Sequence, residues 1–222
     1  MKKILPEFVP PIVRRITGKM RKVLTQEDSK WEFGVEQPPA YYDEKFVRRD
    51  HWRQHYTESR YYPLWAIIVD RIERIKPELI LDVGCGSGQF ANLLQDKHVE
   101  KYIGVDFSPA RIEWARKICP EFRFEVEDVF KSNIIEATNA DCVVFLEFLE
   151  HIEKDIDVIS KVREGAYVIA SVPNFPATGH VRYFESVGEV ITRYEPFFSK
   201  IRVDEHLANR EGERYYLIEG IR

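Results

Sequence analysis

The feature that most constrains the fold is an alternation, from residue 64 onward, of short apolar runs with segments whose apolar residues recur at helical spacing. Strands are predicted over residues 79–81, 102–105, 122–126, 142–146 and 167–170, and helices over residues 63–75, 90–97, 109–117 and 154–162. Successive strands joined through a helix form right-handed crossovers. The alternation therefore predicts an α/β fold with a parallel sheet that is buried on both faces.

The C-terminal region departs from this pattern. Two strand-like runs, residues 200–204 and 214–221, are separated by a polar region around Glu211 and Gly212. So short a connection permits only an antiparallel pair, because parallel neighbours need a crossover of about a dozen residues or more. The sheet is therefore expected to end in an antiparallel hairpin.

Cysteine and charge content limit the class of protein. The three cysteines, Cys85, Cys119 and Cys142, show no CxxC spacing, which disfavours a disulfide scaffold or zinc knuckle and favours a reducing, cytoplasmic setting. No apolar run approaches the length of a membrane span, and no signal peptide is recognisable. The net charge of −4 divides into +6 for residues 1–24 and −10 for the remainder. An acidic body disfavours nucleic acid as a partner.

Composition divides the chain into three parts. Residues 1–24 form a basic leader with apolar residues at helical spacing, residues 25–62 a linker and an aromatic N-terminal lid, and residues 63–222 the main domain. The leader matches a helix that lies on an anionic membrane surface, which would place the protein at the inner membrane face. The alternative is a helix docked on the domain or on a partner subunit.

Aromatic residues are concentrated just before the first predicted strand. Residues 41–65 contain 8 aromatic side chains in 25 positions. One interpretation is that these rings pack the leader onto the core; the other is that some of them cover a ligand pocket. In the second interpretation Trp52 and Trp65 pack, and the side chains that reach ligand are Tyr41, Tyr42, His55 and Tyr56.

A glycine-rich turn follows the first predicted strand. In the segment LDVGCGSG, Gly84, Gly86 and Gly88 let the backbone turn sharply and approach a ligand without a Cβ in the way. Asp106 ends the second predicted strand, 22 residues after Gly84. In dinucleotide-binding folds a carboxylate near that distance accepts hydrogen bonds from ribose hydroxyls. The pattern thus indicates a nucleoside-containing cofactor.

Four segments together resemble class I S-adenosylmethionine-dependent methyltransferases. They are LDVGCGSGQF, YIGVDFSPARIEWAR, EVED at residues 125–128 and ADCVVFLEFLEHI at residues 140–152. The resemblance covers roughly residues 60–222 in order and spacing. It implies a Rossmann-like sheet of seven strands in the order 3-2-1-4-5-7-6, with strand 7 antiparallel and helices on both faces.

The same resemblance implies roles for individual residues. The glycines would shape the turn under the methionine part of S-adenosylmethionine, Asp82 would orient that turn or hold the amino group, and Asp106 would bind the ribose. Phe107 and Asp128 would contact the adenine, Asp128 with a helix N-cap or turn carboxylate as its alternative role. The full set of expected cofactor residues is Asp82, Gly84, Cys85, Gly86, Gly88, Asp106, Phe107, Glu127, Asp128, Val129, Leu146 and Tyr42.

Catalytic candidates follow the fourth predicted strand. His151 is suited to proton abstraction near neutral pH, with Glu147 and His180 as its companions. The E-x-x-E-H pattern also resembles the metal-binding segment of small-RNA 3′-terminal 2′-O-methyltransferases and of some ubiquinone-biosynthesis O-methyltransferases. The expectation is a site without metal. A divalent cation held by Glu147, Glu150, His151 and His180 is the alternative.

The acceptor is indicated only by a second resemblance. The stretch from Pro173-Asn174 to Phe184 and the leader resemble methyltransferases encoded among surface-glycan and lipopolysaccharide biosynthesis enzymes. This favours a small-molecule or glycan acceptor methylated at oxygen. The alternatives are an NAD-dependent oxidoreductase, whose glycines would follow GxGxxG, and a non-catalytic cofactor-binding or membrane-surface regulator. The acceptor atom and the oligomeric state stay open.

Overall fold

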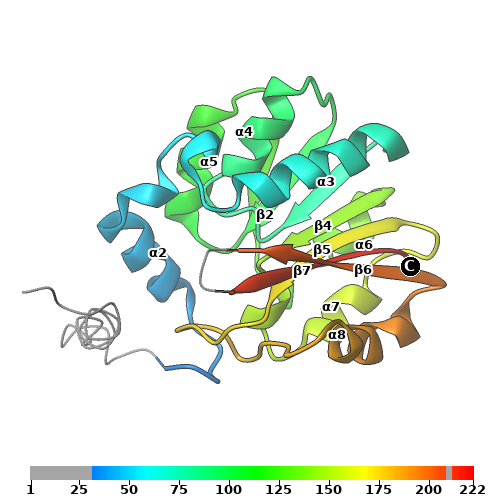
Figure 1. Ribbon diagram of the computed structural model, residues 1–222. Coiled ribbons are helices and arrows are strands. Elements are labelled where there is room, and N and C mark those ends of the chain that lie inside the picture. Colours follow the sequence, from blue (N-terminus) through cyan, green and yellow to red (C-terminus); the bar gives the residue numbers. More distant parts are fainter. Residues whose placement is uncertain (1–31, 209–211) are drawn as a thin grey trace, which may run out of the picture. The chain divides into compact units, whose positions relative to one another are not determined.

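A single seven-stranded sheet organises the protein in the computed structural model, which describes residues 32–208 and 212–222 (Figure 1). The sheet order is β3-β2-β1-β4-β5-β7-β6. The strands are β1 (Ile80–Val83), β2 (Tyr102–Asp106), β3 (Arg123–Val126), β4 (Cys142–Leu146), β5 (Tyr167–Pro173), β6 (Lys200–Leu207) and β7 (Arg214–Ile221). The leader at residues 1–24 lies outside the described residues, as do residues 25–31 of the linker that follows it.

Strand direction changes only at the C-terminal end of the chain. The neighbouring pairs from β3 to β5 are parallel, whereas β7 is antiparallel to both β5 and β6. The predicted α/β class, the strand order and the antiparallel closing hairpin are therefore confirmed. All parallel strands end at the same edge of the sheet, where loops from different strands can meet.

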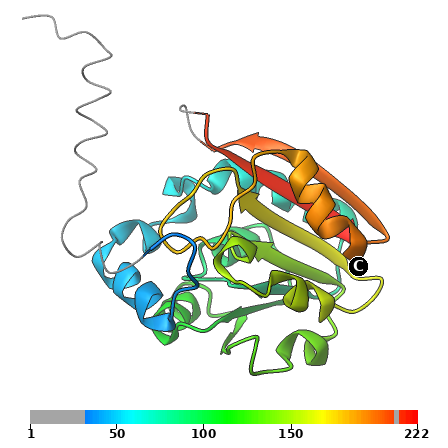
Figure 2. The ribbon, with the colours of Figure 1, turned by 90° about the horizontal axis from the view of Figure 1, so that it is seen from below.

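Helices cover both faces of the sheet (Figures 1 and 2). On one face lie α3 (Tyr62–Ile75), α4 (Gln89–Asp96) and α5 (Pro109–Ile118); on the other lie α6 (Ile134–Thr138), α7 (Asp155–Ser160) and α8 (Val187–Tyr194). Neighbouring strand residues point to opposite faces, so Ile80 belongs to one apolar cluster and Leu81 to the other. Both are buried, which explains why the central strands are apolar without alternation.

The aromatic segment before the sheet belongs to the same compact unit as the sheet. This unit comprises Phe33–Arg222. It contains α2 (Pro39–Arg48) and the short 3-10 helices Asp50–Trp52 and Tyr56–Glu58. The Tyr56 hydroxyl donates to Asp96 in α4 (2.7 Å), and the Ser87 hydroxyl donates to the Trp52 carbonyl (2.6 Å). The segment therefore contacts the loop that carries the three glycines. None of the described helices is long and apolar enough to cross a membrane.

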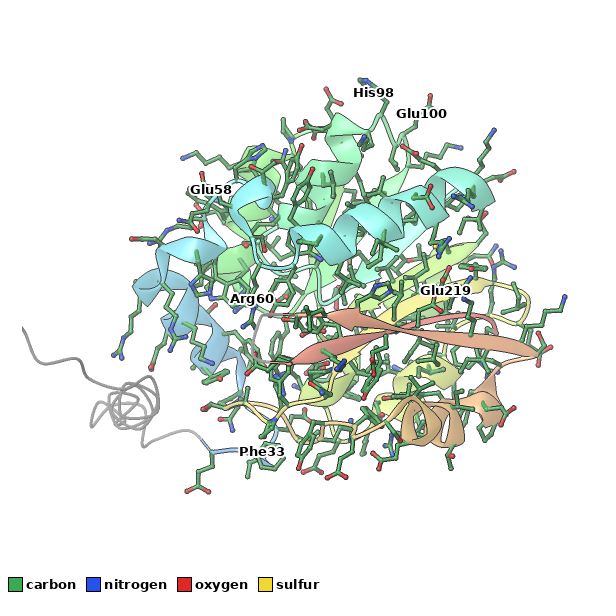
Figure 3. The ribbon with its side chains drawn as sticks, in the orientation of Figure 1. Phe33, Glu58, Arg60, His98, Glu100 and Glu219 are labelled. Carbon is green, nitrogen blue, oxygen red and sulfur yellow. The ribbon has the colours of Figure 1, made fainter. Side chains whose placement is uncertain are left out.

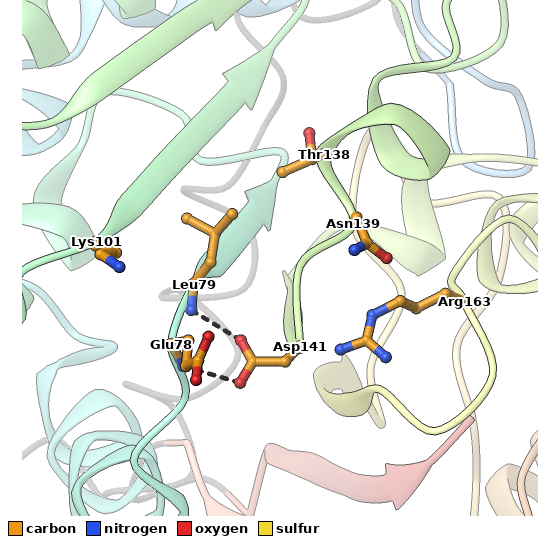
Figure 4. Close-up of a pocket in the computed structure, with 7 residues that line it drawn as sticks. All are labelled: Glu78, Leu79, Lys101, Thr138, Asn139, Asp141 and Arg163. Atoms are coloured by element: carbon orange, nitrogen blue, oxygen red, sulfur yellow. Dashed lines mark hydrogen bonds between the residues drawn. The ribbon is translucent and has the colours of Figure 1, made fainter.

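A pocket of ≈ 370 Å³ opens at the edge of the sheet where the parallel strands begin (Figure 4). Two of its charged side chains already have backbone partners. Asp141 accepts hydrogen bonds from the backbone N–H groups of Glu78 and Leu79, both at 2.8 Å, and Arg163 donates to the Ala140 carbonyl (2.9 Å). These bonds tie the starts of β1 and β4 together, and the glycine loop lies at the opposite edge.

Candidate active site

The glycine loop follows β1 and is held against the end of β2. Gly84, Gly86 and Gly88 have φ angles of 80°, 57° and 79°, a region that residues with a Cβ rarely adopt. The backbone N–H groups of Gly84 and Cys85 donate to the Val105 carbonyl at 2.7 and 3.1 Å. A Cβ on Gly84 would lie 2.4 Å from a ring carbon of Phe148. Glycine is therefore needed both for the turn and for the close approach of the β4 loop.

Asp106, at the end of β2, organises the same loop. One carboxylate oxygen accepts from the Gly86 N–H (3.0 Å) and the other from the Ser108 N–H (2.8 Å). Burial raises the pKa of Asp106, against the lowering effect of the Arg111 guanidinium and of these two hydrogen bonds. The carboxylate is thus fixed at the mouth of the glycine loop, where the sequence predicted it.

Asp82, in β1, lies behind the loop and is 2% exposed. Its carboxylate accepts a hydrogen bond from the Tyr102 hydroxyl at 2.6 Å. Burial nevertheless raises the pKa of Asp82 to about 7. Two buried carboxylates, Asp82 and Asp106, therefore lie near the loop with their ionised forms disfavoured. A cationic ligand would relieve that cost.

The pH dependence of stability should reveal Asp82. The pKa of Asp82 is raised from 3.8 to about 7 in the folded protein. As pH rises, Asp82 therefore ionises in the unfolded chain before it ionises in the folded one. Asp82 should therefore lower the free energy of unfolding by roughly 2–4 kcal/mol between about pH 4 and pH 7. Urea titrations between about pH 4 and pH 7 should show that Asp82→Asn loses less free energy of unfolding with rising pH than the wild type does. The matched control is Asp70→Asn, at a half-exposed position in α3, which should track the wild type. Parallel curves for Asp82→Asn and wild type would contradict the assignment.

Tyr42 lies between the loop that follows β2 and the loop that follows β4. Its ring centroid lies 5.2 Å from that of Phe107, on the β2 side, and 5.9 Å from that of His151, on the β4 side. The guanidinium carbon of Arg111 lies 5.1 Å from the Tyr42 ring centroid and 5.3 Å from that of Trp52. Arg111 was not predicted from the sequence, because nothing in its own helix indicates contact with residues about 60–70 positions earlier.

The other expected cofactor residues surround this core. Cys85 and Leu146 are half-buried on the loop and at the end of β4, and Val129 is buried. The Glu127 N–H donates to the Asp106 carbonyl at 3.1 Å. Asp128 accepts from the Phe130 N–H (3.0 Å) and from Lys131 Nζ (2.7 Å). These bonds correspond to the turn role that was the alternative for Asp128.

Glu147 follows β4 in a left-handed conformation with φ of 51°. Its carboxylate accepts from the Ser171 hydroxyl in β5 at 2.9 Å, and the same hydroxyl oxygen accepts from the Glu147 N–H at 2.9 Å. Burial raises the pKa of Glu147. Such strain in a non-glycine residue is concentrated at functional sites. Ser171 was missed by sequence reasoning because its partner is 24 residues away.

Glu150, His151 and His180 form a compact group beyond Glu147. One potential ligand atom from each of the three lies within 4.8 Å of the others. Nδ1 of His151 is 2.7 Å from the Gly179 carbonyl and Nδ1 of His180 is 3.3 Å from the Phe175 carbonyl. Since a carbonyl can only accept, each Nδ1 carries the proton and each Nε2 keeps a lone pair. Glu147 is outside this group.

Electrostatics in this group favour neutral imidazoles. Burial lowers the pKa of His151 to about 3, with His180 as the next cause, and burial lowers that of His180 to about 4. Glu150 is fully buried, and neither of its carboxylate oxygens has a hydrogen-bond partner among the described residues. Burial also raises its pKa well above the ordinary value. A divalent cation fits this donor set, since imidazoles held at Nδ1 by carbonyls are typical metal ligands.

Arg182 holds the loop of His180 against the short 3-10 helix Leu149–His151. One guanidinium nitrogen donates to the carbonyls of Leu149 (2.5 Å) and Ile152 (2.6 Å), and the other donates to that of Glu153 (2.9 Å). The Val181 N–H also donates to the Glu150 carbonyl at 2.7 Å. The relative position of the two histidines thus depends on Arg182, which no local sequence signal identified.

Comparison with known proteins places this architecture in a family. A profile of the family described as methyltransferase domain matches residues 51–203, more than half of the chain. Among curated proteins, the tRNA (carboxymethyluridine(34)-5-O)-methyltransferase of Saccharomyces cerevisiae is 28% identical over 123 residues, which cover 52% of this chain and 42% of that protein. The chain therefore matches less than half the length of this curated relative.

Two solved structures show the same fold over most of the chain. The N-methyltransferase NodS from Bradyrhizobium japonicum WM9, in complex with S-adenosyl-L-homocysteine, is 18% identical with a TM-score of 0.64 and covers 83% of this chain and 98% of its own. Magnesium protoporphyrin IX methyltransferase from Synechocystis PCC 6803, also with S-adenosylhomocysteine bound, is 17% identical with a TM-score of 0.64 and covers 83% and 97%.

Proposed function

This chain belongs to the methyltransferase-domain family, and we propose that it transfers the methyl group of S-adenosylmethionine to an oxygen of a small-molecule or glycan acceptor. Family membership makes S-adenosylmethionine the cofactor. The observation that carries the proposal is the pairing, at one sheet edge, of the glycine loop tied to Asp106 with the Glu150, His151 and His180 group. One half binds the methyl donor and the other receives the acceptor.

In the donor half, Asp106 would bind the ribose hydroxyls while Phe107 and Tyr42 contact the adenine. The loop at Gly84, Gly86 and Gly88 would pass under the methionine part. S-adenosylmethionine carries an ammonium and a sulfonium group, and both are cations. Buried carboxylates such as Asp82, whose ionised form is disfavoured in the free protein, are suited to such a ligand.

In the acceptor half, catalysis would depend mainly on holding the acceptor oxygen in line with the methyl–sulfur bond. Nδ1 of His151 carries the ring proton, so Nε2 is the atom that would accept the proton of an acceptor hydroxyl. Burial lowers the pKa of His151 to about 3, which keeps the ring neutral but makes it a weaker base than the sequence led us to expect. Tyr42 would lie between cofactor and His151 and keep water from the reacting atoms. Glu147, anchored by Ser171, would form the wall near the sulfonium.

A divalent metal at Glu150, His151 and His180 is the second candidate. Two Glu150 carboxylate oxygens without a hydrogen-bond partner among the described residues, one of them 3.6 Å from His151 Nε2, favour it over an arrangement of proton carriers alone. When bound, the metal would supply positive charge that positions an acceptor oxygen and favours its deprotonation.

The acceptor class can be tested directly. Labelled S-adenosylmethionine is incubated with matched sets of hydroxyl-bearing and amine-bearing small molecules and sugars, and S-adenosylhomocysteine is measured. We expect product only with hydroxyl acceptors. Transfer to amines alone would contradict the assignment to oxygen. The same assay is run with tRNA, because the name of the yeast relative gives tRNA as its acceptor. The net charge of −10 over residues 25–222 disfavours that class, so efficient methylation of tRNA would contradict the small-molecule or glycan assignment.

The basic leader supports a cytoplasmic protein that binds the inner membrane face peripherally. Each basic residue near an anionic surface can add about 1 kcal/mol of attraction. Such a location would suit a lipid-linked glycan acceptor. Docking of residues 1–24 on the domain or on a partner subunit is the alternative.

A further inference from the structure

A second polar group lies on the β5 and β7 side of the reaction site. Arg60, in the loop before α3, donates from its guanidinium to the Tyr61 hydroxyl at 2.7 Å, with the guanidinium carbon 4.8 Å from the Tyr61 ring centroid. The Tyr61 ring centroid is 5.5 Å from that of Tyr215 in β7. Figure 3 shows Arg60 near the end of the sheet where β7 begins. We call these three residues the Arg60 group.

The Arg60 group contains more donors than acceptors. Tyr215 is 2% exposed, and its hydroxyl has no hydrogen-bond partner among the described residues. The Tyr61 hydroxyl accepts the Arg60 N–H. The Tyr61 and Tyr215 hydroxyls have one proton each. If one hydroxyl donates to the other, only one of these two protons is used. At least one hydroxyl proton and several guanidinium N–H groups are therefore left to donate.

The positive charge of Arg60 is not used in an ion pair within the described part of the chain. The nearby carboxyl group, Glu147, accepts a hydrogen bond from the Ser171 hydroxyl; burial raises its pKa, and that hydrogen bond and the charge of Arg60 lower it in part. Burial followed by the charge of Glu147 raises the pKa of Tyr61 to about 12, so the Tyr61 hydroxyl keeps its proton. The Arg60 group therefore presents donors and a positive charge, which is the pattern that binds anionic oxygens.

Aromatic rings connect the Arg60 group with the histidines. The Phe175 ring centroid lies 5.8 Å from that of Tyr215 and 6.1 Å from that of His180. The His180 ring is in turn 4.8 Å from that of His151. An acceptor whose body lies along these rings would have one end at the Arg60 group and the other at His151.

We propose that Arg60, Tyr61 and Tyr215 form the subsite that binds an anionic group of the acceptor, a carboxylate or a phosphate, while the oxygen to be methylated lies at His151. This assignment rests on the proposed methyl transfer and specifies its substrate class. It explains why a buried tyrosine hydroxyl lacks a partner beside a charged guanidinium.

Calorimetry on the full chain saturated with S-adenosylhomocysteine tests this assignment. The probes are benzoate, phenyl phosphate and neutral benzyl alcohol. We expect at least one of the two anions to bind at least about tenfold more tightly than benzyl alcohol. Whichever anion binds more tightly shows whether the subsite prefers a carboxylate or a phosphate. Arg60→Gln should remove most of this preference, and Tyr215→Phe should weaken it. The matched control is Arg49→Gln, an exposed position in the same segment, which should leave it unchanged.

Equal affinity for anions and alcohol, no anion binding at all, or an anion preference that survives in Arg60→Gln would overturn the subsite. The affinity for S-adenosylhomocysteine should stay unchanged in Arg60→Gln. Wild-type protein that binds S-adenosylhomocysteine without any anion preference would refute the subsite alone. Wild-type protein that does not bind S-adenosylhomocysteine would refute the proposed function and the subsite together.

Discussion

Replacement of Asp155 by alanine is expected to lower the free energy of unfolding by about 3–5 kcal/mol, the range for removing one partner of a buried ion pair. Asp155 is fully buried at the start of α7. It accepts two hydrogen bonds from Arg193 (2.8 and 2.6 Å) and one from the Tyr194 hydroxyl (2.9 Å), and it forms an ion pair with Arg182 at 3.3 Å. Without Asp155 both arginines would lose their counter-charge.

Urea unfolding of Asp155→Ala beside Asp157→Ala measures this effect. Asp157 lies in the same helix and is exposed, so its removal should change the stability by no more than about 0.5 kcal/mol. A similar small change for both variants would show that Asp155 contributes little. Since Arg182 also holds the loop of His180, Asp155→Ala should lose activity at temperatures below its unfolding transition.

Removal of His151 should have the largest effect on catalysis. His151→Ala is expected to lower kcat about 100- to 10,000-fold, the usual contribution of a general base, with little change in the affinity for S-adenosylhomocysteine. His98→Ala, at an exposed position after α4, is the matched control and should keep wild-type activity. Wild-type kcat in a folded His151→Ala protein would remove His151 from the mechanism.

A chelator separates the two candidate chemistries at the same residues. If Glu150, His151 and His180 hold a cation, excess chelator should abolish activity, and Glu150→Ala should do the same without loss of cofactor binding. Full activity in excess chelator would refute the metal and leave His151 as a base. The lowered pKa of His151 adds a second readout. A metal-free enzyme should show no inflection near pH 6.5 from this residue, because it stays neutral down to about pH 3.

The central fold was predictable because its signals are local. The strands are short apolar runs, and burial of both faces leaves few polar positions to obscure them. The order of the strands came from the family resemblance and not from the runs themselves. Helices α2 and α8 were not predicted, since their apolar residues lie among charged side chains and their partners are distant in sequence. Tyr41, expected to reach ligand, is buried and donates to the Thr178 carbonyl at 2.5 Å.

The donor half of the site was visible in the sequence for the same reason. Gly84, Gly86 and Asp106 mark a turn and a strand end, and the structure joins the turn to the strand end through the bonds of Gly86 to Asp106 and of Gly84 to Val105. The acceptor half was only partly visible. Arg182 contacts residues about 30 positions away, and Tyr61 and Tyr215 meet from opposite ends of the domain. No local pattern records such contacts, because only the crossing of chain segments in the fold creates them.

Calorimetric titration of S-adenosylmethionine and NAD into the wild-type protein and Asp106→Ala tests the central claim most directly. The control variant is Asp70→Ala, at a half-exposed position on α3. We predict that the wild type and Asp70→Ala bind S-adenosylmethionine and not NAD. Asp106→Ala should lose roughly 1.5–3 kcal/mol of binding free energy, the value of a hydrogen bond to a charged group. Binding of NAD in preference to S-adenosylmethionine, or unchanged S-adenosylmethionine affinity in folded Asp106→Ala, would contradict the account.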